Sequence, residues 1–342
     1  MGKYFLIFII IAALSLPACG SMETAGAPAT LKIGLVAPFE GLHRPLGYEA
    51  LFGVKLALQE QNLAGGVGGY RIELVALNDF DDPLEAEAQA RALIADPGVV
   101  GVIGHLSSAA TQAALPVYRK ADLAVVIPWS VTAEVDLGPS GVVSVAANLA
   151  ETEAQLKTVG QALGFEQITP LTHSGFDSIP AGTQALSLNT EGVTAGERLV
   201  SLRQADITLP VLGQVETGSP QTLQVAREAA AGFIFVSPSP DPRQMNEAAS
   251  FVAAYQALAG FPPGPRALLA YDATQVLLEA IKQSMSDNNT PVRAKVGVAL
   301  VMVQHQGLSG LITFDRLGRR VAAPVWVYQI IDNTYPGVLV TP

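Results

Sequence analysis

A regular alternation of short apolar runs with longer helical segments restricts the fold of this chain more than any other sequence feature. The run from Leu31 to Pro38 is apolar without strict polar alternation, which is typical of a strand buried on both faces. Asp82-Pro83 is typical of a helix start, with the aspartate as N-cap and the proline in the first helical position. The strands expected in this first unit cover residues 31–38, 70–77, 99–104 and 123–128, and the helices cover residues 47–62, 83–95 and 107–121. This order predicts a parallel sheet with helices on both faces.

The same alternation returns in the second half of the chain. Helices are expected at 149–163, 194–205, 219–230, 244–260, 268–286 and 291–304, and strands at 167–172, 185–188, 209–213, 232–236, 310–314 and 325–331. Two α/β units of similar order predict two lobes, with a cleft where the carboxyl ends of their strands face each other. Open α/β sheets bind ligands at those ends.

The composition excludes several classes of protein. Apolar residues make up 49% of the 342 residues and charged residues only 15%, which excludes a disordered chain and is sufficient for the cores of two lobes. The formal net charge is −10, and an acidic surface repels phosphate backbones, so no nucleic-acid partner is expected. Cys19 is the only cysteine, so no disulfide within the chain is expected.

The first 18 residues have the layout of a secretory signal peptide. Lys3 supplies the positive charge, and the apolar run from Phe5 to Leu16 is too short for a permanent transmembrane helix. Cys19 resembles the lipidated cysteine of a bacterial lipobox; an ordinary signal peptide with an incidental cysteine is the alternative. We therefore expect an extracytoplasmic protein held at the membrane by a lipid on Cys19, with residues 19–30 as a flexible tether.

Several segments together resemble the branched-chain amino-acid binding proteins of ABC importers. They are the strand at 31–38, the glycine turn at 65–69, and residues 78–83, 102–112, 251–255 and 271–273. The resemblance implies the type I periplasmic binding protein fold, an α/β architecture of two Rossmann-like lobes with parallel-sheet cores joined by a multi-strand hinge. It places lobe 1 at 31–144 plus 266–322 and lobe 2 at 145–265 plus 323–342, with hinge strands near Ser144, Arg266 and Ala322.

Ser107 and Ser108 follow a buried strand and begin a helix. Their hydroxyls and the free N–H groups of the first helical turn are suited to a carboxylate, although helix capping alone is the alternative. The resemblance implies that Ser108, with Ser107 beside it, holds the carboxylate of the ligand. It also implies that the Ser130 backbone and the Thr132 hydroxyl contact the polar end of the ligand, whereas Trp129 either stacks on its side chain or fills the hinge.

The second lobe of the family supplies an acid for the ligand's ammonium. The register of the resemblance puts Val215 at that position, so Glu216 beside it is the candidate, with a solvated loop glutamate as the alternative. Thr190 and Glu191 lie in another cleft-facing loop, and Phe39 is expected to line the pocket from the first lobe.

The chain also departs from the family. Residues 146–184 have room for only one helix and one strand, so the second lobe is reduced, and a tyrosine position of the family is Leu46 here. Amino-acid specificity is therefore not carried over by the resemblance.

The function expected is that of a solute-binding lipoprotein, which captures a small amino acid or related carboxylate for an ABC permease in the membrane. A sensor or scaffold lipoprotein with the same fold is the alternative, and an enzyme is a third class. The four histidines have no metal-ligand spacing, and no nucleophile elbow, Walker loop or dinucleotide fingerprint occurs. No catalytic residue, no metal site and no cofactor is therefore expected.

Overall fold

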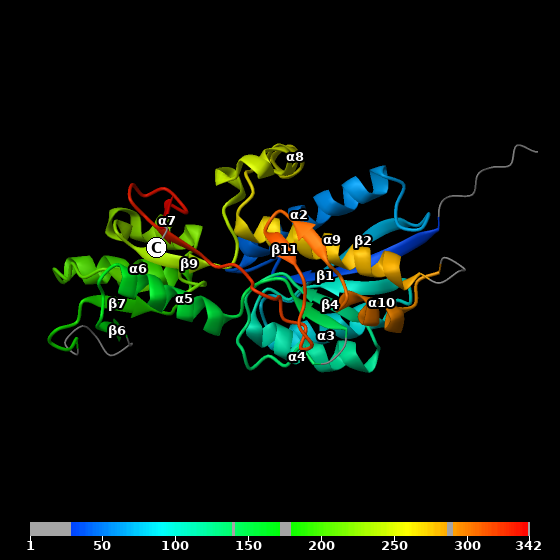
Figure 1. Ribbon diagram of the computed structural model, residues 1–342, viewed down its shortest axis with the longest axis horizontal. Helices are drawn as coiled ribbons and strands as arrows, with labels where there is room; N and C mark the ends of the chain where they lie inside the picture. The colour runs from blue at the N-terminus through cyan, green and yellow to red at the C-terminus, as the bar shows by residue number, and fades with distance from the viewer. Residues whose placement is uncertain (1–28, 139–140, 172–178, 286–289, 341–342) are drawn as a thin grey trace, which may run out of the picture.

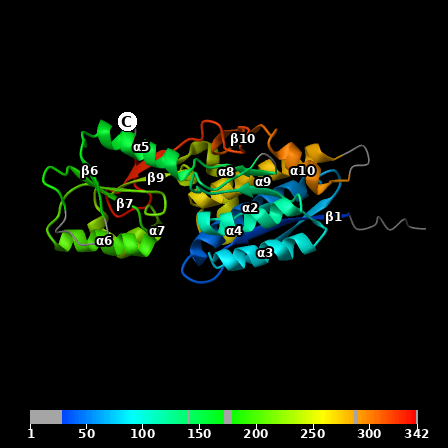
Figure 2. The same cartoon turned by 90° about the horizontal axis from the view of Figure 1, so that it is seen from below.

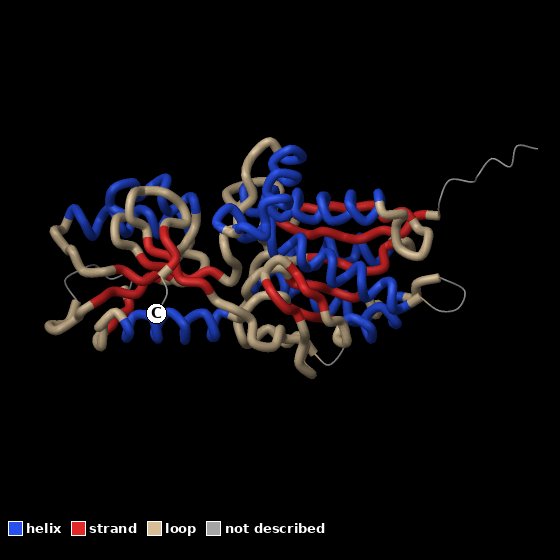
Figure 3. The backbone as a smooth tube through the Cα atoms, turned by 45° about the horizontal axis from the view of Figure 1, so that its top comes forward, coloured by secondary structure: helices blue, strands red, loops and turns tan. Residues whose placement is uncertain are grey.

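The computed structural model describes residues 29–138, 141–171, 179–285 and 290–340, which form two α/β lobes side by side along the longest axis (Figure 1). The predicted signal peptide at 1–18 and the predicted lipidation site Cys19 lie outside these residues. Within the described ranges, no helix is long and apolar enough to cross a bilayer. Each lobe is built on its own sheet, which Figure 3 shows as two separate groups of strands flanked by helices.

The first sheet is parallel throughout, with the order β2-β1-β3-β4-β5. Its strands are β1 (Thr30–Ala37), β2 (Arg71–Asn78), β3 (Val99–Ile103), β4 (Ala124–Ile127) and β5 (Val142–Ser144). One face packs on α3 (Pro83–Ala95) and α4 (Ser108–Lys120), and the other on α2 (Arg44–Leu63), α9 (Pro265–Ser284) and α10 (Arg293–Leu300) (Figure 2). Because both faces are covered, β3 and β4 have no exposed residue, as their unbroken apolar sequences predict.

The second sheet has the order β13-β12-β9-β8-β7-β6. Four parallel strands, β6 (Ile168–Pro170), β7 (Ala185–Leu188), β8 (Val211–Gly213) and β9 (Ile234–Ser237), are followed by the antiparallel β12 (Trp326–Gln329) and β13 (Val338–Leu339). The helix α5 (Leu149–Ala162) covers one face, and α6 (Gly192–Gln204) and α7 (Pro220–Ala226) cover the other. The predicted two-lobe α/β architecture is confirmed, and the antiparallel end of this sheet is an addition to the predicted parallel core.

Local chemistry explains several helix boundaries. The Asp82 carboxylate accepts hydrogen bonds from the N–H groups of Leu84 and Glu85 at 2.8 and 3.0 Å, so the predicted N-cap of α3 is confirmed. Asn148 and Glu151 form a capping box that begins α5 where the chain enters the second lobe.

Three predicted helices are shorter than expected. The helix predicted at 219–230 ends at Ala226, because Arg227 has a φ of 47°, and continues as the 3-10 turn η1 (Arg227–Ala230). The segment predicted as a helix at 244–260 begins with two 3-10 turns, η2 (Pro242–Gln244) and η3 (Asn246–Ala248), before α8 (Ala249–Ala259). The helix predicted at 291–304 ends at Leu300, and the chain then forms the hairpin of β10 (His305–Gly307) and β11 (Gly310–Ile312).

Helix α8 belongs with the first lobe by its packing. Its Phe251 and Tyr255 form a buried cluster with Leu56 of α2 and Leu268 of α9, and the Tyr255 hydroxyl donates to the backbone oxygen of Glu49 at 3.0 Å. A lobe boundary at residue 266 would separate α8 from these partners. We therefore propose that the second crossing between the lobes lies at 238–248.

A buried arginine joins two of the crossings. Arg320 is 3% exposed, and its guanidinium donates to the backbone oxygen of Val145 at 3.0 Å and to that of Ser309 at 2.9 Å. Burial lowers the pKa of Arg320 to about 10. The segments around it also run together, since the Ser144 N–H donates to the Gly318 oxygen at 2.9 Å. Arg320 therefore ties the exit of β5 to the chain that leads back to the second lobe.

Replacing Arg320 is expected to destabilise the fold strongly. Arg320→Ala leaves buried carbonyl oxygens without a donor, which costs about 2–4 kcal/mol of unfolding free energy in urea denaturation. Arg316→Ala, at an exposed position in the same loop, is the control and is expected to change stability little. Equal stability of the two variants would show that the Arg320 bonds carry no net stabilisation.

Candidate ligand-binding site

A cavity of about 410 Å³ lies between the two lobes at the carboxyl ends of their strands. Its first-lobe wall is formed by Pro38, Leu42, His43, Leu46, Asp81, Leu106, Ser107, Ser108 and Ala109. Its second-lobe wall is formed by Leu149, Glu191, Gly192, Val193, Thr194, Glu216, Ser219 and Gln221. The volume suits a small molecule, and the lining combines aliphatic side chains with a few polar groups, as small-molecule sites do.

The two predicted serines lie in this cavity at the start of α4. Ser107 is the N-cap residue, and its hydroxyl oxygen accepts from the Ala110 N–H at 3.4 Å. The Ser108 hydroxyl oxygen accepts from the Thr132 N–H at 2.9 Å, which joins the β3 and β4 loops. The positive end of the α4 dipole and its first N–H groups thus face the gap between the lobes, where they favour a negative charge.

Three side chains from the two lobes meet behind the cavity. The Glu216 carboxylate, from the loop after β8, accepts from the Trp129 indole N–H at 3.1 Å and from the Arg266 guanidinium at 3.3 Å. The Arg266 guanidinium also lies over the Trp129 ring, 3.9 Å from its centroid. Because Trp129 and Arg266 come from the first lobe and Glu216 from the second, these contacts hold the lobes together.

Burial explains the electrostatics of this group. Arg266 is 5% exposed, so its charge depends on a partner, and Glu216 supplies one. Burial raises the pKa of Glu216, while the positive charge of Arg266 opposes that rise. Arg266 itself is positioned by Glu49, whose carboxylate accepts from the N–H groups of Arg266 and Ala267 at 2.8 and 3.2 Å at the start of α9.

A second inter-lobe contact closes the mouth of the cavity. His43 Nε2 lies 3.5 Å from an oxygen of Glu191, the residue preceding α6 in the second lobe. The same nitrogen lies 3.7 Å from an oxygen of Asp81, in the turn after β2. The imidazole therefore stands between two carboxylates, one from each lobe.

The remaining predicted residues lie around the cavity rather than in its lining. The Ser130 hydroxyl is buried and donates to the Ala147 oxygen at 2.6 Å. Thr190 is bonded through its backbone to the Thr217 hydroxyl, and its own hydroxyl oxygen is buried with no hydrogen-bond partner among the described residues. The Phe39 ring packs edge-on against Tyr48, with centroids 5.9 Å apart, and its neighbour Pro38 reaches the cavity instead.

Sequence reasoning did not assign His43, Asp81 or Arg266 to the site. His43 and Asp81 follow the first two strands, so their loop positions were a usable signal, but their partner Glu191 is more than a hundred residues away. Arg266 was expected only near a hinge. Its place behind the cavity depends on Glu49 and Trp129, which only the folded chain brings together.

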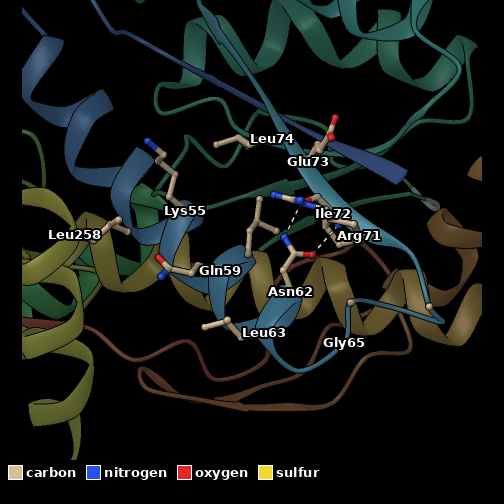
Figure 4. Close-up of a pocket in the computed structure, with 13 residues that line it drawn as sticks. Lys55, Gln59, Asn62, Leu63, Gly65, Arg71, Ile72, Glu73, Leu74 and Leu258 are labelled. Carbon is tan, nitrogen blue, oxygen red and sulfur yellow. Dashed lines mark hydrogen bonds between the residues drawn. The ribbon is translucent and has the colours of Figure 1, made fainter. Parts of the chain in front are cut away.

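A larger hollow of about 740 Å³ lies elsewhere, between α2 and the edge strand β2 (Figure 4). Asn62 spans it, since its side-chain amide exchanges two 2.8 Å hydrogen bonds with the backbone of Ile72. None of the predicted ligand residues lines this hollow, and its lining comes from the first lobe and α8. The inter-lobe cavity is therefore the candidate site.

The chain was compared with known protein families. The profile of the family described as periplasmic binding protein matches residues 30–172 and 150–334. The chain belongs to this family. The resemblance expected from the sequence is thus confirmed.

Relatives and solved structures agree with this assignment. Leu/Ile/Val-binding protein homolog 1 of Brucella abortus is 25% identical over 304 residues, which cover 76% of this chain and 80% of the relative. The Leu/Ile/Val-binding protein of Escherichia coli K12 is 24% identical over 61% of each chain. The matches to an amino acid binding protein and a Leu/Ile/Val/Thr/Ala-binding protein of Pseudomonas aeruginosa span only 30% and 28% of those proteins.

Solved structures share the whole fold. A branched-chain amino acid transporter substrate-binding protein of Streptococcus pneumoniae, in complex with isoleucine, has a TM-score of 0.78 at 21% identity and covers 92% of this chain and 100% of its own. The solute-binding protein of an ABC transporter from R. palustris, in complex with benzoate, has a TM-score of 0.73 at 17% identity and covers 91% of this chain and 95% of its own. These structures establish the type I periplasmic binding protein fold for this chain.

Removing the charge of Glu216 is expected to loosen the contact between the lobes. Glu216→Gln keeps an acceptor for Trp129 but loses the ion pair with Arg266, which weakens the closed arrangement by about 1.5–3 kcal/mol. Small-angle X-ray scattering of the ligand-free protein is expected to give a larger radius of gyration for this variant. Glu228→Gln, an exposed acid of the same lobe, is the control. Superimposable scattering from all three proteins would contradict the role of Glu216.

Stability is also expected to depend on pH through Glu216. Since burial raises its pKa above the ordinary 4.5, the folded protein holds this proton more tightly than the unfolded chain. The stability contributed by the protonated form is therefore present below about pH 4.5 and lost as the pH rises through the raised pKa. Melting temperatures measured from pH 4 to pH 7 are expected to fall in the wild type relative to Glu216→Gln. Parallel curves would contradict this direction.

Proposed function

We propose that this protein is the extracytoplasmic solute-binding component of an ABC importer, which captures a small carboxylate or amino acid between its lobes and delivers it to a membrane permease. The observation that carries the proposal is the position of Ser107 and Ser108 at the start of α4, in the cavity between the lobes. The names of the relatives, which include Leu/Ile/Val-binding proteins, support the same class of ligand.

In this proposal the first lobe binds the anionic group of the ligand. The hydroxyls of Ser107 and Ser108 and the first N–H groups of α4 bind the carboxylate, and Thr132 fixes Ser108 through its backbone N–H. The aliphatic part of the ligand contacts the leucines of the cavity, namely Leu42, Leu46, Leu106 and Leu149. Closure is then linked to binding, because only the closed lobes make both kinds of contact.

The second lobe is less well suited to an ammonium group than expected. Both oxygens of Glu216 already accept hydrogen bonds, from Trp129 and Arg266, and Glu191 faces His43. An ammonium group would have to compete with these partners for either acid. We therefore place the main polar recognition at the carboxylate, which fits both the isoleucine and the benzoate found in proteins of this fold.

The anchor belongs to the same proposal. Cys19, which follows the apolar run at 5–16, is the proposed lipidation site, and the tether leads from it to β1 at Thr30. A lipid at this point would hold the lobes near the membrane that contains the permease.

The decisive test measures ligand binding in Ser108→Ala. Calorimetric titration with leucine, isoleucine, valine and benzoate is expected to identify a ligand of the wild type, and the variant is expected to bind it about tenfold or more weakly, since a hydrogen bond to a charged group is lost. Ser250→Ala, at an exposed position of α8, is the control, and melting temperatures confirm that all three proteins are folded. A loss of less than about threefold would count against the carboxylate site.

A further inference from the structure

The contact between His43, Asp81 and Glu191 has the composition of a metal site. One oxygen of each carboxylate and one nitrogen of the imidazole all lie within 4.8 Å of one another. They come from three separate segments, namely the loop before α2, the turn after β2 and the residue that precedes α6. All three residues line the cavity between the lobes.

The distances between these atoms suit one shared ion. Tetrahedral zinc with bonds of about 2.0–2.1 Å holds its ligand atoms about 3.4 Å apart. The imidazole nitrogen lies 3.5 Å from Glu191 and 3.7 Å from Asp81, each within a few tenths of an ångström of that separation, and the two carboxylate oxygens lie within 4.8 Å of each other. Three protein ligands leave a fourth position for water.

The donor types select a class of cation. Imidazole nitrogen with carboxylate oxygen suits zinc and neighbouring divalent transition metals, whereas calcium and magnesium are bound mainly by oxygen. The surroundings are negative as well, because the charges of Glu191 and Asp81 both raise the pKa of nearby Glu216. A cation would relieve this repulsion.

The supporting structure holds two of the ligands in place. The Asp81 N–H donates to the Asp79 carboxylate at 3.0 Å, and Asp79 is itself fixed by buried His105 at 2.7 Å. The backbone oxygen of His43 accepts from the Leu46 N–H at 2.9 Å in the first turn of α2. The side chains of His43 and Asp81 are 24% and 22% exposed and that of Glu191 is 62% exposed, so an ion can reach the site from solvent.

We propose that His43, Asp81 and Glu191 form a site for a divalent transition metal ion of the zinc type, which bridges the two lobes at the mouth of the cavity. The site goes beyond the proposed function, since it uses none of the groups assigned to the carboxylate. An ion bound there favours the closed lobes, because Glu191 reaches His43 only when they are together.

Cobalt(II) titration of the untagged full-length chain tests the site directly. With no organic ligand present, we expect one equivalent of Co²⁺ to bind with the visible absorption of a four- or five-coordinate ion, and Zn²⁺ to displace it. His43→Ala and Glu191→Gln are expected to weaken Co²⁺ binding about tenfold or more. The control is Glu197→Gln, which changes an exposed acid within α6, the helix that Glu191 precedes. This variant is expected to bind Co²⁺ like the wild type.

Scattering gives a second readout. Zn²⁺ is expected to reduce the radius of gyration of the wild type but not that of Glu191→Gln, whose exposed side chain makes misfolding of that variant an improbable cause. The proposal is overturned if no saturable Co²⁺ binding is found. It is also overturned if Co²⁺ still binds after both substitutions, since the ion would then be bound elsewhere, for example by Cys19.

The two proposals fail separately. Carboxylate binding is measured in the presence of EDTA, and Co²⁺ binding is measured without carboxylate ligands. Ser108→Ala is expected to bind Co²⁺ like the wild type, since Ser108 belongs to the carboxylate site alone. A protein that binds Co²⁺ but no carboxylate would overturn only the proposed function.

Discussion

The arrangement of the two lobes depends on a buried positive charge between them. Arg266 starts the long helix α9 at the back of the cleft, where little water reaches its guanidinium. An uncompensated charge at such a place is costly, so the carboxylate of Glu216 and the face of Trp129 are drawn to it from either side. The same contacts place Glu216 in the lining of the cavity and hold Trp129 outside that lining. The buried charge of Arg266 therefore determines where Glu216 and Trp129 lie, although Arg266 itself is not part of the cavity lining.

Much of the fold is encoded locally, and the sequence predicts that part well. The strands β3 and β4 are continuous apolar runs, and Asp82-Pro83 carries its own start signal for α3. The errors lie where long-range packing decides. The helix predicted at 291–304 ends at Leu300, and residues 305–307 pair with 310–312 as a hairpin that is held in place by Asp272 of α9. Its buried carboxylate accepts from the N–H groups of Leu308 and Ser309 at 3.0 and 2.8 Å, which fixes the hairpin loop against α9.

In the candidate site, too, some residues could be predicted from the sequence and others could not. Ser107 and Ser108 could be found from the sequence because a strand, two hydroxyl residues and a helix follow one another directly. The pairing of Glu216 with Arg266, and that of Glu191 with His43, joins residues 50 and about 150 positions apart, and no spacing rule contains it. Two acids predicted for one ligand therefore have protein partners in the folded chain.

The crossings joined by Arg320 also bear on how the two lobes can move relative to each other. Two of the crossings lie side by side, joined by Arg320 to Val145 and by Ser144 to Gly318. Under the proposed function, opening is then expected to be a rotation about an axis close to these paired segments, which separates Glu191 of the second lobe from His43 and the α4 serines of the first.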